Sequence, residues 1–269
     1  MAIAPAREAS EVFPGLAKFS VAMREEVSEC SRQFLQPEPA GAPELNAARI
    51  DLLNWNIKKG EMPNWRADLE LLGEDKHLVL IQEATRSMSS TEALPRGSIW
   101  SFAAGYVSRN HLTGVATASQ IKPVSACRLT AYEPWSKTPK ATSITKFALA
   151  DSDLNLLVVN THMINFAVGL KDYGYQLSAI REVLRGHDGP VIISGDFNTW
   201  RPGRHKLLRV FIADLDFDEI TFKQDRRLQF FGSTLDHVFV AGISVLQAET
   251  HDVKSSDHNP MTLSLSIDL

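Results

Sequence analysis

Short apolar runs, most of them ending near a polar or charged residue, dominate the chain from Arg49 onward. Runs of this length predict buried strands, and they read RIDLLNWNI, HLVLIQEA, TGVATAS, ATSITKFALA, DLNLLVVNTHM, PVIISGDFN, STLDHVFVAG, ISVLQAET and MTLSLSI. Three helices are predicted between them, in PNWRADLELLGEDK with Asn64 as its cap, in YGYQLSAIREVLRGH and in RHKLLRVFIADL. Strands therefore dominate, and the irregular spacing of the helices favours two stacked sheets covered by helices.

The first 46 residues follow a different pattern. In GLAKFSVAMREEVSECSRQFLQ, apolar side chains recur every three or four residues, from Leu16 through Val27 to Phe34, which predicts one amphipathic helix. PEPAGAP, residues 37–43, then predicts a stiff linker. We expect residues 1–46 to form this helix and linker, and residues 47–269 to form a catalytic domain on which the helix packs. A detachable partner helix is the alternative.

The composition is that of a soluble globular protein, with 44% apolar and 22% charged residues. A net charge of −4 argues against a protein that coats nucleic acid, although a bound metal could still supply positive charge to a nucleic-acid enzyme. No apolar run is long enough to span a membrane and no signal-peptide pattern is present, so a cytoplasmic location is expected. The sequence identifies no protein partner. Cys30 and Cys127 lack zinc-finger spacing and are expected to be buried free thiols, with one disulfide between them as the alternative.

Polar side chains stand in or just after many of the predicted strands. They are Asn56, Glu83, Asn160, His162, Asp196, Asn198, Asp236, Asp257 and His258. Burying such a group without a partner costs roughly 2–7 kcal/mol, so these residues are expected to pair with one another and with a cation.

The chemistry of this set points to phosphate esters. Glu83, Asp257 and the Asn56 oxygen are hard donors of the kind that Mg²⁺ or Mn²⁺ prefers, and no thiolate accompanies them. Histidines and further carboxylates can carry protons and bind anionic oxygen. Together these groups suit the attack of water on a phosphate ester.

The motifs NWNI, IQEA, NTHM, SGDFN, LDHVFV and SSDHNP, in this order from Asn54 to Pro260, resemble those of the endonuclease/exonuclease/phosphatase superfamily. That group includes deoxyribonucleases, abasic-site endonucleases, neutral sphingomyelinases, inositol polyphosphate phosphatases and mRNA deadenylases. The stretch most resembles a bacterial branch whose members are mostly described only by family name. The resemblance implies an α/β fold, a four-layer sandwich in which two mixed sheets pack face to face with helices outside.

The resemblance also implies a role for each motif. Glu83 would be the principal metal ligand, with Asn56 ordering that cluster and Asp257 facing the metal. Asp196 would orient or deprotonate the attacking water, or assist the leaving oxygen, and Asn198 would hold a phosphate oxygen.

The histidines complete the expected site. His162 would donate a hydrogen bond to the phosphate. His258 would lie beside the scissile phosphate as a proton carrier or transition-state donor, and Asp236 would hold its ring. His237 adjoins Asp236, but alternation along a strand points it to the other face, so a structural role is expected.

The sequence departs from the abasic-endonuclease pattern at Lys58, where an acid near the metals is common in those relatives. A cation there suggests a single metal, with Lys58 in contact with the substrate. Three further cations, Lys140, Arg201 and Arg204, are candidates for phosphate contact, but solvation at the surface is the favoured expectation. The apolar segment INFAVGLKDYGY is expected to pack beneath a loop, with the lining of a substrate pocket as the alternative.

The predicted function is a Mg²⁺- or Mn²⁺-dependent phosphoric ester hydrolase acting on a phosphate-ester substrate, with a weak preference for nucleic acid by analogy to the superfamily. A lipid or inositol phosphate substrate is the alternative, although no long exposed apolar hairpin is evident in the sequence. A non-catalytic binding module on the same fold is the second alternative. A serine hydrolase is set aside because the GxSxG elbow is absent.

Overall fold

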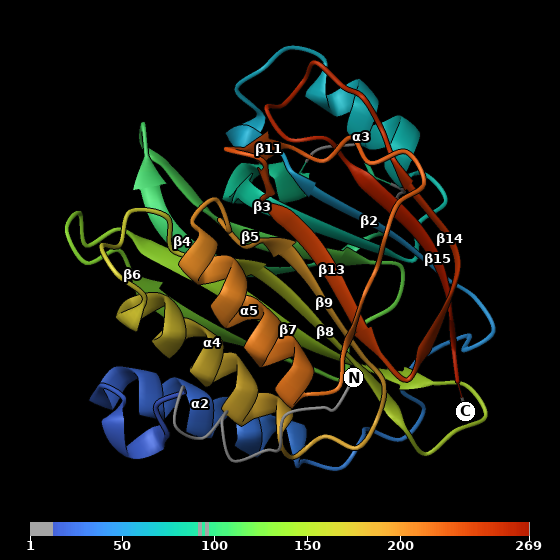
Figure 1. Cartoon of the computed structure of the whole chain (residues 1–269). Coiled ribbons are helices and arrows are strands. Elements are labelled where there is room, and N and C mark those ends of the chain that lie inside the picture. The colour runs from blue at the N-terminus through green and yellow to red at the C-terminus, as the bar shows by residue number, and fades with distance from the viewer. Residues whose placement is uncertain (1–12, 91–92, 95–96, 269) are drawn as a thin grey trace.

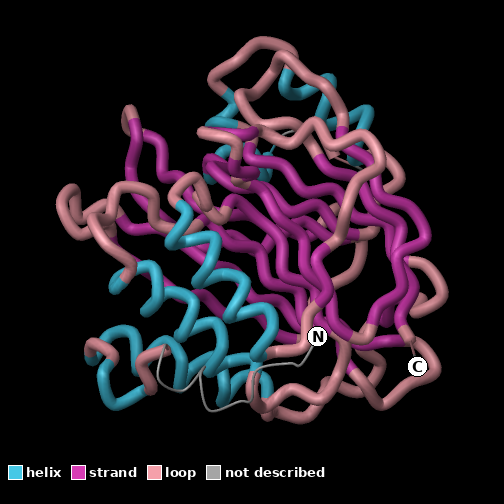
Figure 2. The backbone as a smooth tube through the Cα atoms, viewed as in Figure 1, coloured by secondary structure: helices cyan, strands magenta, loops and turns pink. Residues whose placement is uncertain are grey.

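Two mixed β-sheets stack face to face, with helices on both outer faces (Figures 1 and 2). The computed structural model describes residues 13–90, 93–94 and 97–268. The sheet of strand order β1-β7-β8-β9-β13-β10, which β6 joins by pairing with β7, is called the first sheet, and that of order β14-β15-β2-β3-β5-β4 the second. The predicted four-layer α/β sandwich is therefore confirmed.

The first sheet comprises β1 (Glu44–Leu45), β6 (Ser125–Tyr132), β7 (Pro139–Leu149), β8 (Asn155–His162), β9 (Val191–Asp196), β10 (Asp218–Glu219) and β13 (Asp236–Ala241). The second comprises β2 (Ile50–Asn56), β3 (Leu78–Thr85), β4 (Ile99–Ser108), β5 (His111–Ser119), β14 (Ile243–Thr250) and β15 (Met261–Ile267). A separate short hairpin pairs β11 (Gln229–Phe230) with β12 (Ser233–Thr234). The helices are η1 (Leu16–Lys18), α2 (Val21–Phe34), η2 (Lys58–Gly60), α3 (Trp65–Gly73), η3 (Arg86–Ser90), α4 (Lys171–Leu184) and α5 (Pro202–Asp214).

The central strands β2, β3, β8 and β9 are buried along nearly their whole length and are mostly apolar, because both of their faces are covered. Between the sheets, Leu52 and Leu80 share one apolar cluster with Val158, Ile192 and Val238. A buried amide network also links the two sheets: the Gln82 side chain donates to the oxygens of Asn54 (2.8 Å) and Asn160 (2.7 Å).

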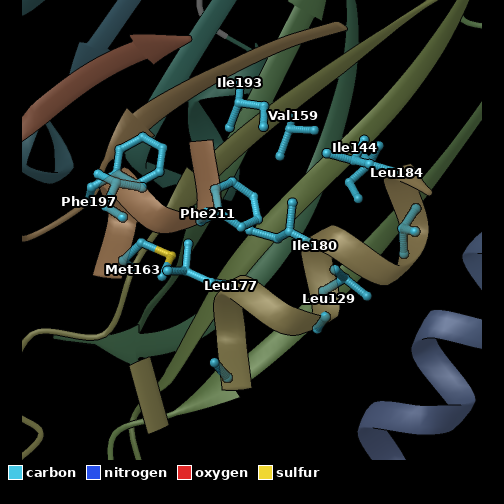
Figure 3. Packing of buried hydrophobic residues seen from close by; sticks show 14 of the residues in the cluster. Leu129, Ile144, Val159, Met163, Leu177, Ile180, Leu184, Ile193, Phe197 and Phe211 are labelled. Carbon is cyan, nitrogen blue, oxygen red and sulfur yellow. The ribbon is translucent and has the colours of Figure 1, made fainter. Parts of the chain in front are cut away.

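On the outer face of the first sheet, the strands pack against α4 and α5 (Figure 3). Val159 and Ile193 of the strands share a cluster with Ile180 of α4 and Phe211 of α5. On the opposite side of the molecule, α3 covers the second sheet through a cluster that contains Leu69 and Trp55.

The N-terminal helix packs on the main body, as predicted, with α2 lying against β6 and α4. It is shorter than predicted: the Ser20 side chain accepts a hydrogen bond from the Met23 amide and caps the helix, which therefore begins at Val21. The prediction of free thiols is wrong, because Cys30 of α2 forms a disulfide with Cys127 of β6. Disulfides persist in oxidising compartments, so this bond argues against the expected cytoplasmic location. The domain boundary after residue 46 stays a prediction.

Two details of the strand and helix predictions also differ. Strands β4 and β6 were not predicted, because neither shows the fully buried pattern of the central strands. Asn64 does precede α3, but its backbone is left-handed and its side chain makes no capping hydrogen bond.

Candidate active site

The strand register gathers the predicted polar residues at one end of the sandwich. In the first sheet, His162 at the end of β8 pairs with Asp196 at the end of β9, which in turn pairs with Asp236 at the start of β13. In the second sheet, the parallel strands β2 and β3 end side by side, with Asn56 paired to Gln82, the residue before Glu83. Segments far apart in the sequence therefore converge because the strands that carry them are neighbours.

Asp196 lies at the centre of this group and is 3% exposed. Its Oδ1 accepts a hydrogen bond from the backbone amide of Asn198 (3.0 Å), and its Oδ2 accepts one from Asn56 Nδ2 (3.0 Å). The same Oδ2 lies 3.5 Å from His162 Nε2 and 3.9 Å from His258 Nε2. Burial raises the pKa of Asp196 to about 6, with Asp236 adding to the rise and the cations His258 and Lys140 opposing it.

The glycine before Asp196 allows β8 and β9 to approach closely. Gly195 has a φ of +149°, and a Cβ at this position would lie 1.9 Å from the Thr161 carbonyl oxygen. Only glycine fits there without a shift of the backbone, so the Ser–Gly pair before Asp196 has a local structural cause.

His258 and Asp236 form a buried pair beside Asp196. The Asp236 Oδ2 lies 2.7 Å from His258 Nδ1, while the Asp236 Oδ1 is buried with no hydrogen-bond partner among the described residues. Burial lowers the pKa of His258, but the carboxylates of Asp236, Asp196 and Asp257 outweigh it and raise this pKa to about 10. The ring is therefore an imidazolium near neutral pH, with Asp236 fixing its orientation.

His162 is neutral by contrast, because burial and the ammonium of Lys140 lower its pKa well below the ordinary value. The Lys140 Nζ lies 2.8 Å from His162 Nε2. An ammonium only donates hydrogen bonds, so His162 Nε2 accepts this bond and the ring proton is on Nδ1. The expectation that Lys140 is solvated is wrong: it is 7% exposed, and its ammonium also lies 5.6 Å from the ring centroid of Tyr106.

Arg204 was also expected at the surface, and this too is wrong, since its side chain is fully buried. Its guanidinium donates to the carbonyls of Ile164 (3.2 Å) and Asn165 (2.8 Å) in the β8–α4 loop, and to that of Asn198 (3.1 Å). Asn198, with left-handed backbone, donates its side-chain amide to the Met163 carbonyl (3.0 Å). Arg204 and Asn198 thus hold the segments after β8 and β9 together. Arg201 is partly exposed and lies over the Trp200 ring.

The acids of the predicted metal site are paired with lysines. Glu83 Oε2 lies 2.7 Å from Lys59 Nζ, and Asp257 Oδ2 lies 3.2 Å from Lys58 Nζ. Lys58, Lys59 and Glu83 all have left-handed backbone, a conformation that costs free energy in residues other than glycine. Strain of this kind concentrates at functional sites.

The residues at the ends of β2 and β3 fit a divalent cation. Glu83 already holds a cation, the Lys59 ammonium, and carboxylate and amide oxygens are the donors that Mg²⁺ prefers. Asp196, Asp236 and His258 also lie close enough together to hold an ion. A metal there would have to displace the ring proton of His258, because only a neutral imidazole binds a metal. The predicted ligands Asn56, Glu83 and Asp257 stay a prediction.

His237 has the structural role predicted for it. Its Nδ1 contacts Glu219 Oε1 (2.7 Å) and its Nε2 contacts the Thr199 hydroxyl (2.9 Å), behind β13 and away from Asp196. The sequence reasoning missed Lys59, and it named Lys140 only to set it aside. Lys140 lies on β7, and β7 pairs with β8, the strand that carries the NTH motif. Recognising that pairing from the sequence could have pointed to Lys140.

The fold and the site together define a family of proteins that generally hydrolyse phosphoric esters: residues 53–258 match the Endonuclease/Exonuclease/phosphatase family, and the chain belongs to it. Among curated proteins, it is 35% identical over 243 residues to a UPF0294 protein of Vibrio parahaemolyticus, covering 89% of this chain and 86% of that protein. It is 37% identical over 233 residues to a UPF0294 protein of Klebsiella pneumoniae, covering 85% and 86%.

Solved structures share the fold at low identity. The human Nocturnin catalytic domain with bound sulfate superposes with a TM-score of 0.64 at 18% identity, covering 87% of this chain and 98% of that one. ANGEL2, described as a 2',3'-cyclic phosphatase and bound to adenosine-2',3'-vanadate, gives a TM-score of 0.60 at 13% identity, covering 87% and 100%.

Proposed function

We propose that the chain is a divalent-metal-dependent hydrolase of phosphoric esters. The observation that carries this proposal is the buried Asp196 at the end of β9, which lies between the neutral His162 at the end of β8 and the protonated His258 in the loop before β15. Asp196 is the proton acceptor and the His258 imidazolium is a fixed cation, and the two lie close enough to act on one phosphoryl group. Membership of a family that generally hydrolyses phosphoric esters supports it.

In the proposed reaction, Asp196 accepts the proton of the attacking water as the new bond to phosphorus forms. The Asn56 amide orients its Oδ2. The His258 imidazolium, held by Asp236, stabilises the negative charge that develops as the ester bond breaks, and can protonate the leaving oxygen.

Lys140 and His162 act as one unit on the phosphoryl oxygens. Since His162 Nε2 accepts from the ammonium, Lys140 supplies the donors that the sequence had assigned to His162. The Asn198 side chain donates a hydrogen bond to the carbonyl of Met163, the residue after His162. In this proposal it contacts a second phosphoryl oxygen.

Glu83, with Asn56 and Asp257, would hold one Mg²⁺ or Mn²⁺ ion, which supplies polarisation of a phosphoryl oxygen when bound. Lys58 pairs with Asp257 and lies near the substrate in this proposal. A cleft of about 870 Å³ is lined by Lys59, which pairs with Glu83, and by Thr85, and would hold the remainder of a substrate in this proposal.

The experiment is turnover of bis-p-nitrophenyl phosphate by the purified protein with Mg²⁺, Mn²⁺ or a chelator. We expect hydrolysis that the chelator abolishes. Screening plasmid DNA, single-stranded RNA, inositol phosphates and sphingomyelin would then separate the nuclease expectation from lipid and inositol substrates. Absence of turnover with every divalent ion, together with no ion bound near Glu83, would favour a binding module instead.

A further inference from the structure

Large apolar side chains crowd the loops around the candidate site and face solvent. We call them the apolar rim: Trp135 (76% exposed), Phe166 (69%), Val168 (66%), Phe230 (49%) and Phe231 (83%). They come from the β6–β7 loop, the β8–α4 loop and the β11–β12 hairpin. The segment INFAVGL packs only in part as expected: Ile164 and Ala167 are buried, whereas Phe166 and Val168 face solvent. The exposed β11–β12 hairpin is short, with strands of two residues each.

These loops are fixed to one another and to the catalytic strands. The buried Glu133 carboxylate of the β6–β7 loop accepts hydrogen bonds from the amides of Asn165 and Phe166. The Trp200 indole, four residues after Asp196, donates to Asn165 Oδ1 (2.7 Å), and its ring lies 6.0 Å from that of Phe230. The rim is thus a built surface at the mouth of the site.

Phe231 is the most unusual member of the rim. It forms a two-residue turn with Gly232, and both have left-handed backbone, with φ values of +50° and +76°. Such turns favour Asn and Gly, and a bulky aromatic side chain is costly there. Its ring contact among the described residues is with Phe230, at 4.5 Å, so the fold gives no internal reason for an aromatic residue at this tip.

The chemistry of the rim fits a bilayer surface. Phe and Trp side chains insert at the boundary between headgroups and acyl chains, and exposed cations beside them face lipid phosphates. Lys137 and Lys171 are exposed and follow the rim residues Trp135 and Val168 closely in the sequence. The partly exposed Arg201 follows Trp200, whose ring contacts Phe230, and the partly exposed acid Asp172 adjoins Lys171. A nucleic-acid platform would be built from rings and a row of cations, whereas Val168 has no ring to stack and the chain carries a net charge of −4.

We propose that the apolar rim docks on a phospholipid bilayer and presents a lipid phosphoester headgroup to the site. The docking is inferred from the apolar rim alone. The inference that a lipid headgroup is the substrate rests on the proposed function. None of the helices in the described part of the chain has the length and apolar content needed to cross a bilayer. In this proposal, the rim holds the protein at the bilayer surface by side-chain insertion.

The test is flotation of the full chain with vesicles of equal parts phosphatidylcholine and phosphatidylglycerol. The wild-type protein should float with the vesicles, and the triple variant Trp135→Ser, Phe166→Ser, Phe231→Ser should lose at least about tenfold in partitioning. Phe231→Asn alone should weaken flotation while keeping or raising the unfolding temperature, because Asn suits the left-handed turn. The control Leu246→Ser removes a side chain that is 57% exposed on β14, outside the rim, and should float as the wild type does.

Wild-type protein that stays out of the vesicle layer, or rim variants that float as well as the wild type, would overturn the proposal. Rim-dependent binding of single-stranded DNA without flotation would overturn it in favour of nucleic acid. A wild-type dimer that the rim variants abolish, again without flotation, would assign the rim to a second copy of the chain. Flotation without turnover of bis-p-nitrophenyl phosphate would leave docking established and refute the proposed hydrolase.

Discussion

At the scale of single residues, the candidate site is defined by buried charges whose partners set their protonation. Lys140 has no carboxylate partner within ion-pair distance among the described residues, and its ammonium instead contacts the His162 ring and the Tyr106 face. A buried ammonium without a counter-ion is costly, and burial lowers the pKa of Lys140. An anionic substrate would supply the missing charge.

We therefore predict that Lys140→Met lowers kcat for bis-p-nitrophenyl phosphate by about 10²–10³-fold, the usual effect of removing one transition-state donor. The control is Lys146→Met on the same strand. Lys146 is also buried, but its Nζ donates to the Phe34 carbonyl at the other end of β7 (3.1 Å). Its loss should affect stability and leave kcat unchanged. Equal kcat values for Lys140→Met and wild type would remove Lys140 from the site.

The Asp236–His258 pair carries a prediction about pH. Because Asp236 raises the pKa of His258, the imidazolium persists up to about pH 10, and activity should decline only as pH rises through that value. In Asp236→Asn the pKa of His258 falls, so the alkaline decline should begin at lower pH. A kcat–pH profile of both proteins checks this, and an alkaline limb that does not move would show that His258 is not needed as a cation.

At the scale of elements, α2 is joined to the sandwich by the disulfide between Cys30 and Cys127, which are 97 residues apart in the sequence. Closing so long a loop restricts the unfolded chain. Glu26 of the same helix also accepts hydrogen bonds from the amide (2.7 Å) and hydroxyl (2.8 Å) of Thr130 on β6, so the helix has polar as well as covalent attachment.

We predict that the double variant Cys30→Ser, Cys127→Ser loses about 2–5 kcal/mol of unfolding free energy. Urea unfolding with and without a reductant measures this. The reductant should destabilise the wild-type protein by a similar amount and leave the double variant unchanged. If both proteins unfold at the same urea concentration under oxidising conditions, the bond does not stabilise the fold.

At the scale of the whole molecule, the sequence predicts the architecture well because strands buried on both faces contain runs of apolar residues, as in β2, β8 and β9. It predicts β4 and β6 poorly, since their residues are only partly buried and show weak patterns. The disulfide was missed because nothing in the spacing of two cysteines shows that α2 lies on β6.

The same contrast holds for the candidate site. Asp196 ends the apolar strand β9, Asp236 begins the apolar strand β13, and His258 stands in the loop just before β15, so each is visible beside an apolar run. Lys140, Lys59 and Arg204 carry no such signal, since an isolated cation is solvated in most sequences. The pairing of β7 with β8 buries Lys140 and the packing of α5 buries Arg204, while the η2 turn brings the half-buried Lys59 to Glu83. The proton-transfer groups were therefore predictable, and the cations that balance them were not.

The most direct test of the central claim is Mg²⁺-dependent turnover of bis-p-nitrophenyl phosphate by wild type, Asp196→Asn and Asp216→Asn. Asp216 is an exposed acid with left-handed backbone, so its replacement by Asn is a matched control. We predict metal-dependent hydrolysis by the wild type, a loss of at least about 10²-fold in Asp196→Asn, and unchanged turnover in Asp216→Asn. Turnover by Asp196→Asn at the wild-type rate would contradict the assignment of this buried carboxylate as the group that activates water.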